Sequence, residues 1–437
     1  MSDYNELKRE AESLRKANNH QMALTAYEKL LNLYENQCNE WEHWGYAHSL
    51  YKLKRYKEAL SALRNAYVKF QNSPKIRNLY AWSIYQTEIN KKIDNEEIYI
   101  KAAKAIFKLA KQSDEYSPYT ITVLKLLDHF KQKPNYPSET ILQLTELLSP
   151  NELSTKTLSY TDEKGKTIEF ASHKEQWYMY RTKALYENER YAECIDVCQE
   201  ILKQLKILHY ANEIWFKRRI ALSNAALGDI EKALKILIEL LSKKKEWFIE
   251  LEIAQLYNDR GDKKAALKYA VDAALNVGDI DKKIGAYQLL FELLEKNNKI
   301  GEAKTHLEFI FAIKREFGYK IDQELNALCE KYNIDETKKA KQLKAKLEII
   351  WAELKFEGKE MNYGIIDAIL ENGKAGFVKD EGGNSFYFLL RDFKNGLKLA
   401  VKNAAVTFYV VDGFNKKKNR STKNAVNVRL YTQNVVQ

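Results

Sequence analysis

Residues 261–267 read Gly-Asp-Lys-Lys-Ala-Ala-Leu, and variants of this pattern recur along most of the chain. Each copy carries one small residue in the same place, and successive copies are 33 to 39 positions apart except for one gap of 135. Another small residue precedes four of the copies by twelve positions. The two series are Ala23, Ala59, Cys194, Ala233, Ala266 and Ala303, and, upstream, Ala11, Ala47, Ala221 and Ala254. A period of this length indicates an array of similar structural units.

The small residues have a structural explanation, because two antiparallel helices joined by a tight turn approach closely only where both carry small side chains. The spacing resembles that of the tetratricopeptide repeat family over roughly residues 4–317 and most weakly over 85–172. The resemblance implies an all-α domain of residues 1–320, with about six to eight helical hairpins stacked as a right-handed solenoid. The long gap leaves room for about three more degenerate units or for an insertion.

One segment, residues 158–170, breaks the helical pattern. β-forming residues flank a turn at Lys164-Gly165, which predicts a small β-hairpin inserted in the solenoid. Gly165-Lys166-Thr167 also matches the end of a phosphate-binding loop, but that loop needs a glycine where Tyr160 stands. We therefore expect a plain turn.

The composition excludes several classes of protein. The chain has 437 residues, with only 5 Pro and 16 Gly and a net charge of +11, which argues against collagen-like and low-complexity proteins. It lacks an apolar leader and any run of 18 apolar residues, so we expect a cytoplasmic protein with no membrane partner. The spacing of Cys38, Cys194, Cys198 and Cys329 fits no disulfide or zinc framework, so we expect no metal and no cofactor.

A helical extension is expected at residues 321–356. Apolar residues follow helical spacing from Leu343 to Leu354, and the opposite face carries Lys338, Lys339, Lys341, Lys344 and Lys346. This face is either the solvated side of a connecting helix, the interpretation that we favour, or a basic stripe leading towards a nucleic-acid site.

The composition changes at about residue 357, where glycines become frequent. Five β-rich runs alternate with turns at 363–370, 375–380, 385–390, 405–411 and 425–431. Short strands at this density predict a small closed barrel of the OB kind over residues 357–437.

Sequence fragments in this region resemble the cold-shock domain in the order of that family's strands. They are Gly364-Ile365-Ile366, Gly373-Lys374-Ala375-Gly376-Phe377-Val378, Ser385-Phe386-Tyr387-Phe388, Val406-Thr407-Phe408-Tyr409-Val410 and Asn424-Ala425-Val426-Asn427-Val428. The resemblance implies binding of single-stranded RNA or DNA, with bases stacked on aromatic side chains of the second and third strands.

The resemblance implies that two residues of this chain, Phe377 and Tyr387, stack on bases. Lysines beside them would neutralise phosphates, and the candidates are Lys374 and Lys379. The family's other stacking positions fall on side chains that cannot stack, namely Ala368, Ala375 and Leu389. Because side chains alternate along a strand, we expect Phe386 and Phe388 to point into the barrel.

A second feature that points to nucleic acid is the absence of acidic residues from Gly413 to Gln437. A basic loop beside an aromatic residue is typical of a nucleic-acid site, although a solvated hairpin is the alternative. The candidate residues are Phe414, Lys416, Lys417, Lys418, Arg420 and Lys423.

No catalytic motif is recognisable, and we do not expect an enzyme. The leading hypothesis is an adaptor whose solenoid binds a protein or peptide in its groove and whose barrel binds single-stranded RNA or DNA. Trp215 and Arg218, at the start of a repeat's first helix, are the candidate protein contacts, unless they belong to a solvated basic helix end. Two alternatives stay open: a pure protein scaffold with a degenerate barrel, and, by analogy alone, an accessory subunit of a bacterial conflict or phage-defence system.

Overall fold

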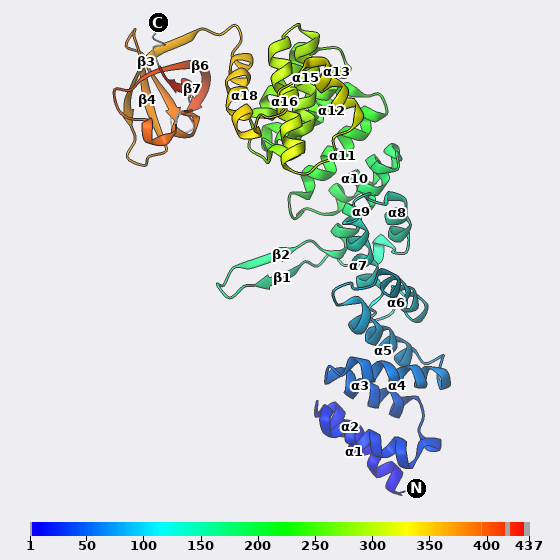
Figure 1. Cartoon of the computed structure of the whole chain (residues 1–437). Helices are drawn as coiled ribbons and strands as arrows, with labels where there is room; N and C mark the ends of the chain where they lie inside the picture. The colour runs from blue at the N-terminus through cyan, green and yellow to red at the C-terminus, as the bar shows by residue number, and fades with distance from the viewer. Residues whose placement is uncertain (1, 395, 416–419, 432–437) are drawn as a thin grey trace. The chain divides into compact units, whose positions relative to one another are not determined.

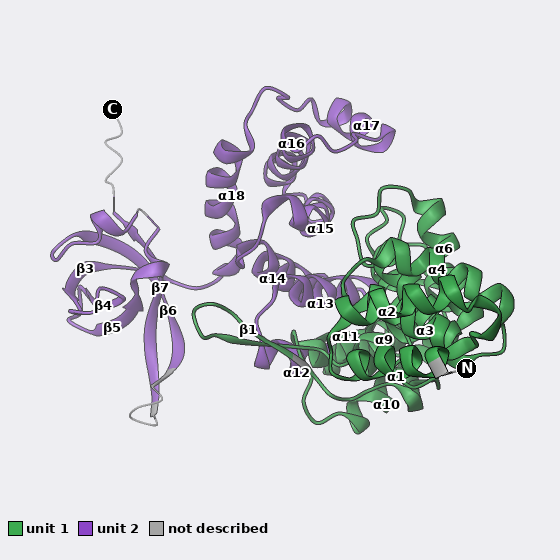
Figure 2. Ribbon diagram, turned by 90° about the horizontal axis from the view of Figure 1, so that it is seen from below, with its two compact units in different colours: residues 1–236 green, residues 237–437 purple. Residues whose placement is uncertain are grey.

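The computed structural model describes residues 2–394, 396–415 and 420–431 (Figure 1). The chain forms two compact units, residues 1–236 and 237–437 (Figure 2).

The first unit consists of paired helices and one small sheet. Its elements are α1 (Ser2–Lys16), α2 (His20–Leu33), α3 (Glu40–Lys52), α4 (Tyr56–Lys69), α5 (Pro74–Ile84, continued as one π-helical turn over Tyr85–Ile89), α6 (Glu96–Leu109), α7 (Tyr119–Lys131), α8 (Ser138–Glu146), β1 (Leu158–Thr161), β2 (Thr167–Phe170), α9 (His173–Glu187), α10 (Tyr191–Gln204) and α11 (Asn212–Ala226). Helix α12 (Ile230–Lys243) contains the boundary between the units.

The second unit begins with six further helices and ends in five strands. The helices are α13 (Trp247–Asp259), α14 (Lys263–Leu275), α15 (Ile284–Lys296), α16 (Ile300–Glu316), α17 (Gln323–Tyr332) and α18 (Ala340–Lys355). The strands are β3 (Met361–Ile369), β4 (Ala375–Asp380), β5 (Ser385–Leu389), β6 (Ala405–Asn415) and β7 (Arg420–Leu430).

The recurring Gly-Asp of the sequence pattern joins the two helices of a pair. Gly261 has φ +84° after the end of α13, and the side chain of Asp262 accepts a hydrogen bond from the backbone N–H of Ala265 at the start of α14. Gly228 (φ +92°) and Asp229, whose carboxylate accepts from the N–H of Lys232, repeat this arrangement before α12. A left-handed glycine followed by an aspartate N-cap ends one helix and begins the next within two residues.

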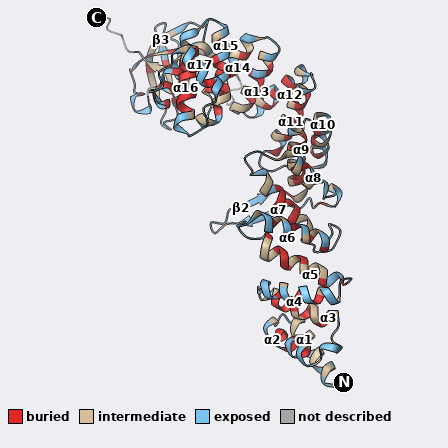
Figure 3. Cartoon of the chain, turned by 45° about the vertical axis from the view of Figure 1, so that its right-hand side comes forward, coloured by how far each residue is buried: buried red, intermediate tan, exposed pale blue. Residues whose placement is uncertain are grey.

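The small residues of the two sequence series are all buried, and buried residues line the facing sides of the helices (Figure 3). All ten have an exposed fraction of 0%, which confirms that they lie where helices cross closely. Cys194 also donates from its Sγ to the backbone oxygen of Thr182 on the preceding helix, at 3.3 Å. The gap of 135 residues between Ala59 and Cys194 contains helices α5 to α9, with the inserted hairpin between α8 and α9.

The β1–β2 hairpin is present where the sequence predicted it. Its register pairs Leu158 with Phe170 and Thr161 with Thr167. Gly165 has φ +76°, and the carboxylate of Asp162 accepts from the N–H groups of Lys164 and Lys166. The Gly-Lys-Thr sequence therefore lies in a turn between two strands and does not precede a helix.

The helices at residues 321–356 pack on the repeat array. The indole of Trp351 in α18 is stacked on the ring of Tyr287 in α15, with centroids 5.6 Å apart and planes 6° apart. Its Nε1–H donates to Nε2 of His306 at 2.8 Å, and Nδ1 of His306 lies 2.7 Å from the backbone oxygen of Glu302. These two contacts fix a neutral imidazole with its proton on Nδ1. On the basic face, Lys338 pairs with Glu308 and Lys344 with Glu348.

The five strands close into a barrel in the order β3-β4-β5-β7-β6, with β6 paired back to β3. Only β5 and β7 pair in parallel. This is the strand order of an OB barrel. Phe386 and Phe388 are buried in its core, as the alternation predicted. Over the described residues the chain is thus a tetratricopeptide-like helical array followed by a closed five-stranded barrel.

Enlarging a small crossing residue should destabilise the first unit. We expect Ala59→Leu to lower the free energy of unfolding by about 1–3 kcal/mol, since the site has no room for extra methylene groups. Urea unfolding of the full chain measures this, with Ala192→Leu on the exposed face of α10 as the matched control. Equal effects of the two substitutions would contradict the close crossing.

Stability should also fall on mild acidification, through His306. Burial lowers the pKa of this imidazole to about 4, against about 6.5 in an unfolded chain. Between these values only the unfolded state binds the proton, so the unfolding free energy should fall by up to about 3 kcal/mol as the pH drops. Urea unfolding from pH 7 to 4.5 should show a weaker pH dependence in His306→Gln than in the native chain; identical slopes would contradict this account.

Candidate nucleic-acid interface

The outer wall of the barrel carries the two predicted stacking residues side by side. Strands β4 and β5 pair so that Phe377 faces Tyr387. Their neighbours along the strands, Val378, Phe386 and Phe388, point into the core, which leaves Phe377 and Tyr387 outside and half-buried. The two ring centroids are 5.8 Å apart at 71°, an edge-to-face arrangement. The two rings therefore lie side by side on one wall, the edge of one towards the face of the other, and we call this pair the platform.

The backbone under this platform is tightly packed. A Cβ at Gly376, the residue before Phe377, would lie 2.5 Å from the backbone oxygen of Ala368 in β3 and 2.8 Å from the ring of Phe388. Only glycine fits there without a shift of β3 against β4. The sequence resemblance placed a glycine at this position, and the structure gives the physical reason for it.

The predicted lysines near the platform are exposed. Lys374 lies in the turn between β3 and β4, and Lys379 follows Phe377 by two residues on the same wall. In the register Lys379 lies between Ile365 of β3 and Ser385 of β5. Lys374 precedes Phe377 by three residues and Lys379 follows it by two, so an exposed lysine lies on each side of Phe377 along the chain.

The basic loop predicted after Gly413 is shorter than expected, because the strands extend into it. Phe414 lies in β6 and Arg420 begins β7, so both belong to the β6–β7 ladder. Lys423 is exposed on β7 directly opposite Asp412, whose charge opposes that of the lysine. Lys416, Lys417 and Lys418 lie outside the described residues.

The positions at which this chain lacks the stacking residues of the cold-shock family lie around Phe377. Ala368 is beside Phe377 in β3, while Ala375 is opposite Leu389 and almost fully buried. The sequence did not single out a further aromatic pair on the barrel, Tyr363 and Tyr431, which are both 45% exposed with centroids 5.4 Å apart. Tyr363 precedes the exposed Ile365 by two residues on β3. The alternation of side chains along that strand could therefore have predicted that Tyr363 is exposed.

The predicted protein contacts lie on α11. The guanidinium of Arg218 lies 5.4 Å from the ring centroid of Trp215, and both side chains are half-buried. The neighbouring Arg219 is 8% exposed and donates to Oγ1 of Thr182, so it belongs to the core. Burial lowers the pKa of that guanidinium.

A cavity of about 480 Å³ in the first unit was not predicted. It opens between α3 and α5, and we call it the α3–α5 groove. Its lining is mainly aromatic, with two lysines and one amide side chain. The lining residues are Trp44, His48, Tyr51, Lys52, Lys75, Asn78, Leu79, Trp82 and Tyr116. The ammonium of Lys75 lies 4.0 Å from the ring centroid of Trp41, and Arg15 lies 4.9 Å from that of Trp44. Aromatic walls with cations at the rim suit an acidic segment that carries an apolar side chain.

Polar atoms without hydrogen-bond partners gather at this groove. They are Nε of Arg15, Nδ1 of His20, Nδ1 of His48 and Oδ1 of Asn78. Burial, assisted by Arg15 and Lys52, lowers the pKa of His48 to about 4, so its imidazole is neutral at pH 7.

The described ranges contain neither a membrane-spanning helix nor a cluster of metal-ligating side chains. There, every helix is too short or too polar to cross a bilayer. In the same residues, no three His, Cys, Asp or Glu side chains gather in an arrangement that could hold a metal ion.

Comparison with known proteins places part of the chain in a family model. A domain of unknown function (DUF7017) matches residues 214–350. No curated protein matches the chain. Among solved structures, one chain of the Naa15/Naa10 complex bound to HypK-THB is 14% identical with a TM-score of 0.42, and the match covers 76% of this chain and 46% of that one. This chain therefore spans less than half the length of that neighbour.

Two further solved structures contain tetratricopeptide repeats. A tetratricopeptide repeat protein from Parabacteroides merdae is 12% identical with a TM-score of 0.29, over 76% of this chain and 99% of that chain. The TPR2AB-domain:pHSP90 complex of yeast Sti1 is 12% identical with a TM-score of 0.28, over 67% and 98%. At these identities no ligand or activity transfers to this chain.

Proposed function

We propose that this protein is a non-enzymatic adaptor that binds single-stranded RNA or DNA through its barrel and a protein through its helical array. The observation that carries the nucleic-acid half is the Phe377–Tyr387 pair on the outer wall of an OB-type barrel, between exposed Lys374 and Lys379. This is the cold-shock mode of binding, reduced to two stacking residues. Stacking supplies affinity for any base, and the lysines add a contribution that depends on salt.

The protein-binding half is supported by the α3–α5 groove. Cations on aromatic rings favour an acidic partner segment with an apolar side chain. The Trp215–Arg218 pair on α11 is a second candidate contact. A pure scaffold is the competing function, and the loss of stacking side chains at Ala368 and Ala375 favours it.

Removing the platform should abolish most nucleic-acid binding. Each stacked base contributes about 1–3 kcal/mol, so Phe377→Ala/Tyr387→Ala should weaken binding to a labelled single strand about tenfold or more. Fluorescence anisotropy with the full chain, at two salt concentrations, measures both affinity and salt slope. The matched control is Tyr160→Ala/Phe170→Ala, which removes two exposed aromatics from the β1–β2 hairpin.

The platform variant and its control separate the two functions. Loss of binding in the platform variant alone supports the adaptor. Absence of binding by the native chain at low salt would contradict the nucleic-acid half and leave the scaffold.

Reversing one charge in the α3–α5 groove should weaken peptide capture. A random peptide library selected on the full chain should enrich sequences in which Asp or Glu adjoins an apolar residue. Lys75→Glu should weaken the best such peptide about tenfold, since it replaces attraction by repulsion at the rim. Lys57→Glu, at an exposed position of α4, is the control. Equal binding by both variants would contradict this groove as the peptide site.

A further inference from the structure

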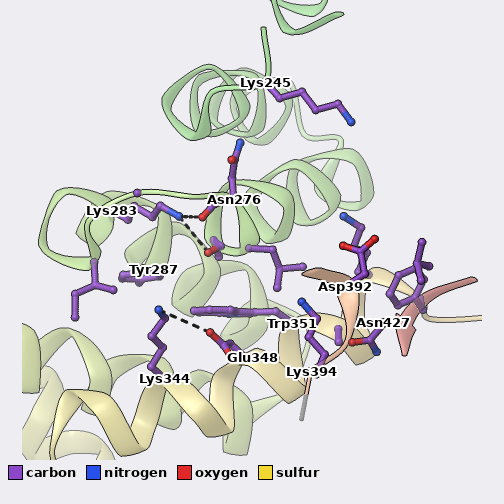
Figure 4. A pocket seen from close by; sticks show the side chains of 18 of the residues that line it. Lys245, Asn276, Lys283, Tyr287, Lys344, Glu348, Trp351, Asp392, Lys394 and Asn427 are labelled. Carbon is purple, nitrogen blue, oxygen red and sulfur yellow. Dashed lines mark hydrogen bonds and ion pairs between the residues drawn. The ribbon is translucent and has the colours of Figure 1, made fainter. Parts of the chain in front are cut away.

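A second cavity, of about 520 Å³, lies within the second unit (Figure 4). The end of α14, the loop after it, α15 and α18 form one side. The barrel forms the other side with Asp392, Lys394, Val411, Val426 and Asn427. The volume is in the range of small-molecule sites in proteins. Neither the barrel platform nor the α3–α5 groove contributes to this cavity.

The lining of this cavity carries five lysines against two carboxylates. The lysines are Lys245, Lys283, Lys344, Lys355 and Lys394, and the carboxylates are Glu348 and Asp392. Lys344 lies 3.8 Å from Glu348, and Lys355 lies 2.7 Å from Asp272, which is outside the lining. Even with these pairs, the lining keeps an excess of positive charge. Lys245, Lys355 and Lys394 are exposed, so water screens their mutual repulsion, but an anion in the cavity would be attracted by the whole set.

Lys283 is the most deeply buried of these lysines, with 2% of its surface exposed. Its ammonium donates to the backbone oxygens of Ala274, at 3.3 Å, and Asn276, at the carboxyl end of α14. Carbonyls at the carboxyl end of a helix attract a cation, which explains why Lys283 is buried there. Burial and the charge of Lys344 nevertheless lower its pKa to about 8, while Glu250 acts in the opposite direction. The helix end does not explain why four more lysines line the same cavity.

Uncharged groups complete the walls. The stacked rings of Tyr287 and Trp351 line the cavity together with Asn276 and Asn427 (Figure 4). Gly278 has φ +153°, and a Cβ there would lie 2.9 Å from both Lys283 and Trp247. Asn427 has φ +51° in the irregular part of β7. Both positions have backbone conformations that most residues avoid, and both border the cavity.

We propose that this cavity binds a nucleoside phosphate. A phosphate monoester carries nearly two negative charges at pH 7, and lysine ammonium groups bind it as point charges. After the pairs with Glu348 and Asp272, three lysines remain against Asp392, an excess of two charges that a phosphate monoester matches and a single carboxylate does not.

Asn276 is engaged, since its amide donates to Glu250 and accepts from the N–H of Val277. The amide oxygen of Asn427 accepts from Nε of Arg429, which leaves its Nδ2 as the donor for the polar edge of a base or for a ribose hydroxyl. Because helices and barrel both contribute, the bound ligand holds the two together.

Isothermal titration calorimetry of the full chain with ADP, AMP, inorganic phosphate and adenosine tests this proposal. We expect ADP and AMP to bind and adenosine to bind at least tenfold more weakly. Lys245→Gln/Lys394→Gln removes two exposed lining charges and should weaken ADP binding about tenfold. Lys398→Gln/Lys402→Gln, with two exposed lysines of the same unit outside the lining, should leave ADP binding within about twofold of native.

The outcomes distinguish this site from the barrel platform. The Phe377→Ala/Tyr387→Ala protein should keep full ADP affinity, since neither residue lines the cavity. Loss of ADP binding in that variant would overturn the proposal. So would the absence of binding at low ionic strength, or equal effects of the two lysine pairs. Inorganic phosphate binding as tightly as ADP would also overturn it, by reducing the site to one for a simple anion.

Discussion

The close crossing of helices at small residues is the constraint on which the helical array depends. Ala254 and Ala266 mark one such crossing, and Thr182 and Cys194 mark another. A larger side chain at either crossing would push the two helices apart. The next helix pair would then lose the surface against which it packs. The fully buried state of every small residue in the two series shows how little room there is. Because the larger apolar residues fill the space to the next pair, each pair depends on its neighbours.

This packing also creates the α3–α5 groove. The first helices of two successive pairs lie next to each other, which leaves their outward side chains to meet over a shared surface. There the chain places Trp44, His48 and Trp82, together with cations from α1 and α5. The same geometry that stabilises the array thus provides a surface suited to a partner.

The barrel follows a different rule, the alternation of side chains along strands. Alternation puts Phe386 and Phe388 in the core and Tyr387 between them on the wall. The glycine before Phe377 permits the close approach of β3 that holds this wall in place. One step further around the barrel, Tyr387 is paired with Asn424 of β7, and β7 continues to Val426 and Asn427 at the lysine-lined cavity.

Sequence reasoning succeeded where the signal is local or periodic. The small residues, the β1–β2 hairpin, and the core positions of Phe386 and Phe388 follow from spacing alone, and the structure confirms them. The strand content after Gly413 was underestimated, because the β6–β7 ladder extends over Gly413–Asn415 and Arg420–Asn424, next to the lysines that suggested a loop. Neither cavity was predicted, since Lys245, Lys283 and Lys394 are far apart in sequence and meet only through tertiary packing.

The central claim is that the barrel holds single-stranded nucleic acid against Phe377 and Tyr387. Ultraviolet cross-linking of the full chain to a single-stranded oligonucleotide, followed by mass spectrometry of the peptides, tests it most directly. The account predicts base adducts on Phe377 or Tyr387 that decrease when unlabelled strand competes. Adducts confined to other parts of the chain, or none under conditions in which the strand is bound, would contradict it.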